Sequence, residues 1–272
     1  MKTMLLNINP KKSLGQNFLI NKGVLEKIIL AAELKGGDTV LEIGPGTGSL
    51  TEKLSEKVLR HGSGQAGRVI AVEKDKRVIA DLKDKFPSVQ IIEEDILKFK
   101  PEEHGLKKGT YKIVANIPYY ITSNLLRVIF EKWPKPELIV LTVQKEVAQR
   151  IAAKPPKMNL LALSVQLYSD HKIVSYVSRG SFRPIPKVDS AIIKLTPHTI
   201  QHPTEEIEKF FKLIKAGFSG KRKQLVNNLS KNFGMMKEDL LKTFDKINIE
   251  NDIRAENLSL NQWIELSKLI KK

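Results

Sequence analysis

Residues 40–48 read Val40-Leu41-Glu42-Ile43-Gly44-Pro45-Gly46-Thr47-Gly48. The first four have the composition of a buried strand, and the next segment, residues 49–60, has the apolar spacing of a helix. Glycines at a strand-to-helix turn let the backbone bend tightly, and they let a ligand approach without meeting a Cβ atom. This stretch therefore predicts a βα unit whose turn is a candidate ligand site.

Strands and helices alternate around this turn. Short apolar runs predict strands at Thr39–Ile43, Arg68–Val72, Val89–Ile92, Lys112–Ala115 and Leu138–Val143. Helical spacing lies between them, at Ser49–Arg60, Lys76–Phe86, Ser123–Trp133 and Val147–Ala153. Two more strand-like runs, Leu167–Val177 and Ser190–Thr196, predict an antiparallel pair at the sheet edge. The fold class is therefore α/β, with a mainly parallel sheet covered by helices on both faces.

The pattern changes after Pro197. Gln201–Pro203 is expected to be a linker, and the rest of the chain has helical spacing. Helices are predicted at Thr204–Ala216, Arg222–Asn232, Lys237–Asp245 and Leu260–Lys271. We expect an α/β domain over residues 1–200 and a small all-helical domain over residues 201–272.

Composition limits the classes of function. The chain of 272 residues contains no cysteine, which excludes disulfides, iron–sulfur clusters and thiolate zinc sites and suits a reducing compartment. Lys and Arg number 46 against 30 Asp and Glu, a net charge of +16 that favours a polyanionic partner such as nucleic acid. No apolar run reaches the ~18 residues of a membrane helix. We expect a soluble, cytoplasmic protein.

Glycine spacing separates the candidate ligands of the turn. The G-x-G-x-G pattern of Gly44, Gly46 and Gly48 departs from the G-x-G-x-x-G of dinucleotide sites. A phosphate loop is excluded because no Gly-Lys-Ser/Thr follows. The pattern resembles motif I of class I S-adenosylmethionine-dependent methyltransferases, which have a Rossmann-like sheet.

Acidic residues follow the next two strands. Glu73 ends the second strand, where a carboxylate can accept hydrogen bonds from both hydroxyls of a ligand ribose. The polar insert His61–Gly67 explains its unusually long spacing from Gly44. Asp95, after the third strand, resembles the acid that binds the cofactor's adenine amino group in this superfamily. With their neighbours Lys74 and Ile96, these residues are expected to bind the cofactor.

The fourth strand ends in Asn116-Ile117-Pro118-Tyr119. This has the N/D/S-x-P-F/Y form of methyltransferases that act on exocyclic amino groups of nucleobases. The N6 of adenine is a poor nucleophile because its lone pair is delocalised into the ring. The Asn116 side chain and the Ile117 backbone each offer a carbonyl to the amino hydrogens, Pro118 fixes the turn, and Tyr119 offers a ring on which an extruded base can stack.

No general base and no metal are implied by this chemistry. The methyl group leaves a sulfonium, so positioning and electrostatics can carry the transfer. His198 and His202 are four residues apart, but Pro197 and Pro203 flank them, which argues against a helical metal face.

The sequence as a whole resembles the rRNA adenine dimethyltransferase family, most closely its small-subunit (KsgA-type) members. The resemblance rests on the opening motif Leu14-Gly15-Gln16-Asn17-Phe18-Leu19, on Asn116–Tyr119, and on residues 144–150, 182–190 and 254–259. It implies that Asn17 and Leu19 line the cofactor pocket together with Asn116. It also implies that Phe182 faces the target base opposite Tyr119.

Family membership would make the chain an S-adenosylmethionine-dependent rRNA (adenine-N6,N6-)dimethyltransferase. The implied substrate is a pair of adjacent adenosines in a hairpin loop near the 3′ end of small-subunit rRNA, within the small ribosomal subunit. A role in late subunit assembly is implied as well, and we expect a monomer.

Two alternatives remain open on the sequence alone, and a third does not fit it. A macrolide-resistance enzyme acting on large-subunit rRNA shares the opening motif and the N-x-P-F/Y loop, although residues 182–190 and 254–259 fit the small-subunit group better. Decay of the Asn116–Tyr119 loop or of the glycine loop would have favoured a non-catalytic assembly or transcription factor. Both loops are intact. A nicotinamide dehydrogenase does not fit the glycine spacing.

Overall fold

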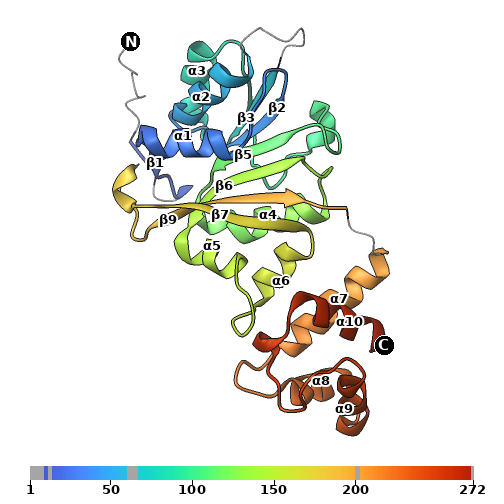
Figure 1. Cartoon of the computed structure of the whole chain (residues 1–272). Helices are drawn as coiled ribbons and strands as arrows, with labels where there is room; N and C mark the ends of the chain where they lie inside the picture. The colour runs from blue at the N-terminus through green and yellow to red at the C-terminus, as the bar shows by residue number, and fades with distance from the viewer. Residues whose placement is uncertain (1–8, 12–13, 60–66, 200–202, 271–272) are drawn as a thin grey trace. The chain divides into compact units, whose positions relative to one another are not determined.

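The computed structural model describes residues 9–11, 14–59, 67–199 and 203–270 (Figure 1). It divides into two compact units, of which one comprises Met1–Ala148 with Asp170–Pro197 and the other Gln149–Ser169 with His198–Lys272. Most of the insert His61–Gly67 and of the linker Gln201–Pro203, together with His202, lies outside the described residues.

The first unit is built on a seven-stranded sheet with the strand order β4-β3-β2-β5-β6-β9-β7. The strands are β2 Thr39–Ile43, β3 Arg68–Glu73, β4 Gln90–Glu93, β5 Lys112–Asn116, β6 Leu138–Gln144, β7 Ser169–Val177 and β9 Ser190–Pro197. Strands β2 to β6 pair in parallel, and β9 runs antiparallel to β6. The predicted parallel sheet with an antiparallel edge is confirmed.

The parallel register gathers the functional positions at one edge. Glu73 pairs with Glu93, and Asn116 pairs with Thr142 on β6. Ile43, the last residue of β2, pairs with Val72 and with Ala115. The carboxyl ends of four strands thus meet where the sequence places the glycine turn and the motif that begins at Asn116.

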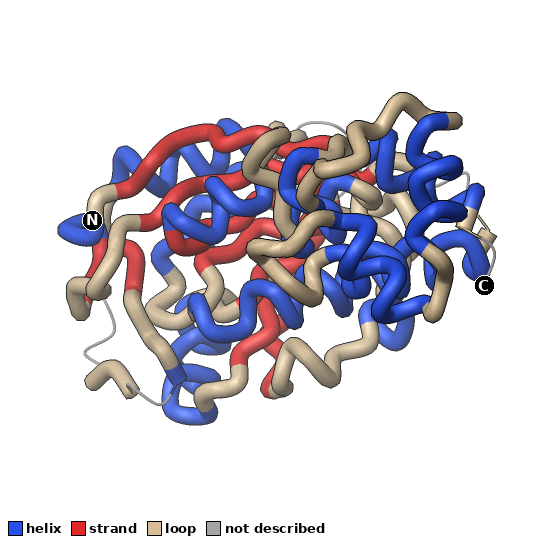
Figure 2. Tube along the Cα trace, turned by 90° about the horizontal axis from the view of Figure 1, so that it is seen from below, coloured by secondary structure: helices blue, strands red, loops and turns tan. Residues whose placement is uncertain are grey.

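Helices cover the sheet, and Figure 2 shows them on both sides of the strands. They are α1 Lys22–Ala31, α2 Ser49–Val58, α3 Lys76–Lys85 and α4 Thr122–Glu131, with α5 Lys145–Ile151 running from the first unit into the second. Buried residues of α1, α2 and α3 form one core with alternate strand residues such as Val40, Ala71 and Val114. The period of two along each strand selects these residues for that face.

A second, two-stranded sheet pairs β1 (Phe18–Leu19) with β8 (Phe182–Arg183) in antiparallel register. Leu19 lies opposite Phe182, and both side chains belong to the core. This pairing fixes the chain just after the opening motif. Strands of two residues give no periodic signal, so the sequence pattern did not predict them.

The second unit consists of helices α6 Leu160–Gln166, α7 Thr204–Gly217, α8 Leu225–Phe233, α9 Lys237–Asp245 and α10 Leu260–Leu269. Buried Trp263 anchors its core, and a capping box of Ser259 and Gln262 begins α10. No helix among the described residues is long and apolar enough to cross a membrane.

The structure differs from the prediction at one strand and two helices in particular. The strand expected from Leu167 begins at Ser169, because the apolar residues before it end helix α6, which the sequence pattern missed. Helix α8 begins at Leu225 rather than Arg222, so the basic residues 221–223 lie in the loop before it. Buried Asn228 holds this loop by donating from Nδ2 to the carbonyls of Gly217 (2.6 Å) and Gly220 (3.1 Å).

Glu42, in the middle of β2, has a side chain in an unusual environment. It is almost completely buried, and neither carboxyl oxygen makes a hydrogen bond with a described residue. Burial raises the pKa of Glu42 to about 8, opposed by the nearby hydroxyl of Thr51 and reinforced by the charge of Glu73. Glu42 is therefore predominantly protonated near neutral pH.

This burial predicts a pH-dependent stability. Below pH 4.5, the ordinary carboxyl pKa, Glu42 is protonated in both the folded and the unfolded state. Between pH 4.5 and about pH 8 it is protonated only in the folded state. The free energy of unfolding should therefore fall as pH rises through this window. In Glu42→Gln the loss should be reduced, so that the variant gains on the order of a few kcal/mol relative to wild type between pH 5 and pH 8.5.

Urea unfolding at several pH values measures this difference. Glu146→Gln, on the exposed surface of α5, serves as the control and should show no such gain. A Glu42→Gln variant whose stability runs parallel to wild type across the range would show that Glu42 is ionised in the folded protein.

Candidate functional site

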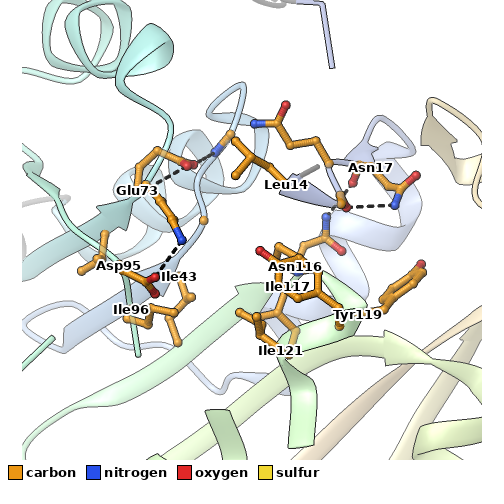
Figure 3. Close-up of a pocket in the computed structure, with 18 of the residues that line it drawn as sticks. Leu14, Asn17, Ile43, Glu73, Asp95, Ile96, Asn116, Ile117, Tyr119 and Ile121 are labelled. Carbon is orange, nitrogen blue, oxygen red and sulfur yellow. Dashed lines mark hydrogen bonds and ion pairs between the residues drawn. The ribbon is translucent and has the colours of Figure 1, made fainter. Parts of the chain in front are cut away.

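A pocket opens at the carboxyl edge of the parallel strands (Figure 3). Five segments line it, namely residues 14–18, the glycine turn at 43, 44 and 46, residues 72–74, residues 94–97 and residues 116–121. Residues 14–18 belong to the opening motif, and the other four segments lie at the carboxyl ends of β2, β3, β4 and β5. Residues far apart in the sequence thus form one cavity.

Most of the predicted site residues meet in this pocket. Those that line it are Asn17, Gly44, Gly46, Glu73, Lys74, Asp95, Ile96, Asn116, Ile117, Pro118 and Tyr119. Leu19, Gly48 and Phe182 are not among the lining residues. The pocket also includes Leu14, Tyr120 and Ile121, which belong to or adjoin the predicted motifs but were not singled out.

Each glycine of the turn has a separate reason to be glycine. All three have positive φ, between +56° and +80°. A Cβ atom on Gly44 would extend into open space, whereas one on Gly46 would lie 2.9 Å from the Phe18 ring and one on Gly48 2.5 Å from the Phe86 ring. The absence of a side chain on Gly44 thus leaves space for a ligand in the pocket. The absence of one on Gly48 lets the Phe86 ring pack against the start of α2.

Glu73 connects the glycine turn to the residues that follow β3 through hydrogen bonds to backbone N–H groups. Its Oε1 accepts the N–H groups of Lys74 and Asp75, both at 2.8 Å, and its Oε2 accepts that of Gly46 at 3.1 Å. Burial raises the pKa of Glu73, and these three hydrogen bonds oppose the rise. A carboxylate has about four acceptor positions. In this conformation about one remains for a ribose hydroxyl, fewer than the two expected from the sequence.

Asp95 and Lys74 form an ion pair at the pocket rim, with 2.8 Å between Oδ2 and Nζ. This bond to Lys74 holds the pKa of Asp95 below its usual range. The other oxygen of Asp95 accepts the N–H of Leu97 at 3.1 Å. Asp95 is therefore an ionised acceptor beside Ile96 at the end of β4.

The Asn116 side chain is oriented from the opposite side. Its Nδ2 donates to the backbone carbonyl of Asn17 at 3.1 Å, and the Nδ2 of Asn17 donates to the carbonyl of Gly15 at 3.1 Å. The Oδ1 of Asn116 accepts no hydrogen bond from a described group and remains available as an acceptor. The adjacent ring of Tyr119 is held by a 2.6 Å hydrogen bond between its hydroxyl and Ser190 Oγ.

Residues 9–11 and 14–17, which we call the strap, are tied to the start of α3. Buried Asp75 accepts hydrogen bonds from Gln16 Nε2 at 2.8 Å and from Nε and Nη2 of Arg77 at 2.9 and 2.6 Å. Arg77 in turn donates to the carbonyl of Asn9 at 3.1 Å. The bond to Arg77 holds the pKa of Asp75 well below its usual range. The sequence motif contains Gln16 but does not indicate this partner.

Phe182 does not face the pocket. Its side chain is fully buried, and β8 pairs it with Leu19. Both residues belong to the hydrophobic core cluster of the first unit. The structure thus gives these residues a supporting position rather than contact with a ligand.

The model of the family "Ribosomal RNA adenine dimethylase" matches residues 7–272. The chain belongs to this family. Ribosomal RNA small subunit methyltransferase A of Dehalococcoides mccartyi (strain CBDB1) is 46% identical over 264 residues, covering 95% of this chain and 88% of that protein. The protein of that name from Fusobacterium nucleatum is 39% identical, covering 96% and 97% respectively.

Solved structures agree with this assignment. A dimethyladenosine transferase from Plasmodium falciparum superposes with a TM-score of 0.75 at 29% identity, covering 92% of this chain and 95% of that one. The 23S rRNA methyltransferase ErmE reaches a TM-score of 0.74 at 24% identity, covering 93% and 98%, and shows the shared fold. The predicted class I methyltransferase fold, enzyme class and S-adenosylmethionine cofactor are confirmed.

The pocket residues fit this cofactor. The open space beside Gly44 leaves room for a ligand against the backbone, and the acidic groups of Glu73 and Asp95 stand at the ends of β3 and β4 as hydrogen-bond acceptors. Asn17, Lys74 and Ile96 line the same pocket. No group of three or more His, Asp or Glu side chains that fits a metal ion occurs in the described ranges.

The strap anchorage predicts an effect on cofactor affinity. Gln16→Ala removes the hydrogen bond to ionised Asp75, so the strap is held less firmly against the pocket. We expect the Kd for S-adenosylmethionine to rise about tenfold, measured by isothermal titration calorimetry. Gln90→Ala, which removes an exposed hydrogen bond to Arg68, is the control and should bind as wild type. Unchanged affinity in Gln16→Ala would mean that the strap does not contribute to cofactor binding.

Proposed function

We propose that this protein transfers methyl groups from S-adenosylmethionine to N6 of two adjacent adenosines in a hairpin loop near the 3′ end of small-subunit (16S) rRNA. The product is N6,N6-dimethyladenosine, and the protein also assists late small-subunit biogenesis. Support comes from the relatives named ribosomal RNA small subunit methyltransferase A, at up to 46% identity over 95% of the chain. The observation that carries the chemistry is the oriented Asn116 carboxamide, with its carbonyl oxygen free at the pocket.

The reaction needs a more nucleophilic adenine N6. When bound, S-adenosylmethionine supplies an electrophilic methyl group on a sulfonium. Asn116 Oδ1 and the Ile117 carbonyl accept the two amino hydrogens, which draws electron density onto N6 and favours a pyramidal nitrogen. Pro118, with φ −58°, directs the turn, and Tyr119 offers its ring to the extruded base. The oxygens on this protein thus act through position and electrostatics.

The binding roles divide between the two sides of the pocket. We assign the cofactor to Asn17, Gly44, Gly46, Glu73, Lys74, Asp95, Ile96 and Asn116. Leu19, Gly48 and Phe182 act indirectly, because they pack behind the residues that line the cavity. This arrangement reserves the end of the pocket at Asn116 and Tyr119 for the target adenine.

The RNA partner is consistent with the net charge of +16. We propose that residues 1–200 form the catalytic domain and that residues 201–272 hold RNA phosphates on the ribosomal particle. Exposed residues of the loop before α8, Lys221, Arg222 and Lys223, are suited to this task. We further propose that the protein acts as a monomer in the cytoplasm.

Methyl transfer from labelled S-adenosylmethionine to unmethylated small subunits tests the proposal. Large subunits are assayed in parallel, and the product nucleosides are identified. Dimethyladenosine on small subunits alone is expected. Label on the large subunit would favour an enzyme of the macrolide-resistance type, and cofactor binding without transfer to either subunit would favour a non-catalytic assembly factor.

The role of Asn116 gives a sharper prediction. Asn116→Ala should lower kcat by about a hundredfold, because one acceptor for the amino group is lost. The Kd for S-adenosylmethionine should rise by no more than about tenfold, the effect expected of a loosened strap, since the bond to Asn17 is lost as well. Asn124→Ala, on the exposed surface of α4, is the matched control and should leave both quantities unchanged. Normal methylation by Asn116→Ala would refute polarisation of the amino group by this side chain.

A further inference from the structure

Exposed aromatic rings are rare on this protein. Among the described residues the large exposed aromatic side chains are Tyr120, 64% exposed, and Tyr176, 53% exposed. The ring of Tyr176 already makes a cation–π contact, with Lys145 Nζ 5.2 Å from its centroid. Tyr120 borders the pocket and makes no hydrogen bond within the described part of the chain. Within the described part of the chain no hydrogen bond or cation contact engages its exposed ring face.

Tyr119 and Tyr120 are consecutive, but they contact different parts of the protein. Both belong to a short 3₁₀ turn, Tyr119–Ile121, that leads into α4. Tyr119 is half-buried and bonded to Ser190 on β9. The ring of Tyr120 lies against the strap, where a Cβ atom on Gly15 would be 3.1 Å from its nearest carbon. Tyr119 is thus directed toward β9, and Tyr120 toward the strap.

We propose that Tyr120 stacks on the nucleobase next to the adenosine held at Asn116. The inference rests on the proposed function. A nucleotide drawn out of a stack leaves its neighbour without a partner, and exposed aromatic rings commonly provide a replacement for bases of single-stranded loops. With two adjacent adenosines as targets, the neighbour is itself an adenine, whose purine ring offers a large surface. Tyr120 therefore binds RNA at the mouth of the pocket.

The position of Tyr120 in the chain favours RNA over the cofactor as its ligand. Tyr120 directly follows Asn116–Tyr119, the loop proposed to hold the target adenine, and its ring is 64% exposed where that loop borders the pocket. The groups assigned to the cofactor's ribose and adenine, Glu73 and Asp95, come from β3 and the end of β4. Tyr120 instead follows the catalytic loop and rests on Gly15, which gives its ring a firm support.

Steady-state methyl transfer to unmethylated small subunits tests this assignment. Tyr120→Ala and Tyr120→Leu should raise KM for the subunits about tenfold, since both remove the aromatic face. Tyr120→Phe should remain within about twofold of wild type, because stacking does not need the hydroxyl. Leu30→Ala removes an exposed apolar side chain, 75% exposed, from α1 and should have no effect. The Kd for S-adenosylmethionine should be the same in all variants.

Other outcomes separate the two proposals. A wild-type KM in Tyr120→Ala would overturn the stacking role and leave the proposed function intact. A weaker Kd for S-adenosylmethionine with an unchanged KM for subunits would also overturn it, because Tyr120 would then be a cofactor cover. If wild-type protein methylates no small subunits, both the proposed function and the role of Tyr120 are wrong.

Discussion

One hydrogen bond, from Asn116 Nδ2 to the carbonyl of Asn17, joins two of the five segments that line the pocket. It spans 99 residues of sequence and is 3.1 Å long. Because a carboxamide that donates from nitrogen must present its oxygen elsewhere, this bond decides where the catalytic acceptor lies. The strap can perform this task only if it is itself fixed. Pairing of β1 with β8 fixes it on one side, and the bond from Gln16 to Asp75 fixes it on the other.

The carboxylates of the site are engaged before any ligand binds. Glu73 accepts three backbone N–H groups, and one of them belongs to Gly46 in the glycine turn. Asp75, two residues later, caps α3 and accepts hydrogen bonds from the side chains of Arg77 and Gln16. The end of β3 therefore connects the glycine turn to the strap. A preorganised site of this kind does not need to order these groups during binding, and so it retains more of the interaction free energy.

The sequence predicted what depends on local pattern. Alternation of strands and helices, the glycine turn and the strand-end motif at Asn116 are encoded within short windows, and the structure brings them to one edge of the sheet. It did not predict what depends on distant pairing. Strands β1 and β8 have two residues each, so neither has a detectable period, and their pairing turns Phe182 into the core instead of toward a base. The sequence pattern likewise did not indicate that Gln16 would bond to Asp75, 59 residues away.

Glu42 and the glycines show why motif residues need not all touch a ligand. Within the single stretch 40–48, Gly44 borders the cavity, Gly48 makes room for Phe86, and Glu42 is enclosed behind the strand with Thr51 nearby. A pattern of residue types therefore records several constraints at once: access for a ligand, packing of a helix, and a buried neutral acid. The structural surroundings of each residue show which constraint it satisfies. The same reasoning applies to Tyr119 and Tyr120. Identical side chains, adjacent in sequence, differ in role because one is bonded to the sheet edge and the other is left exposed above the strap.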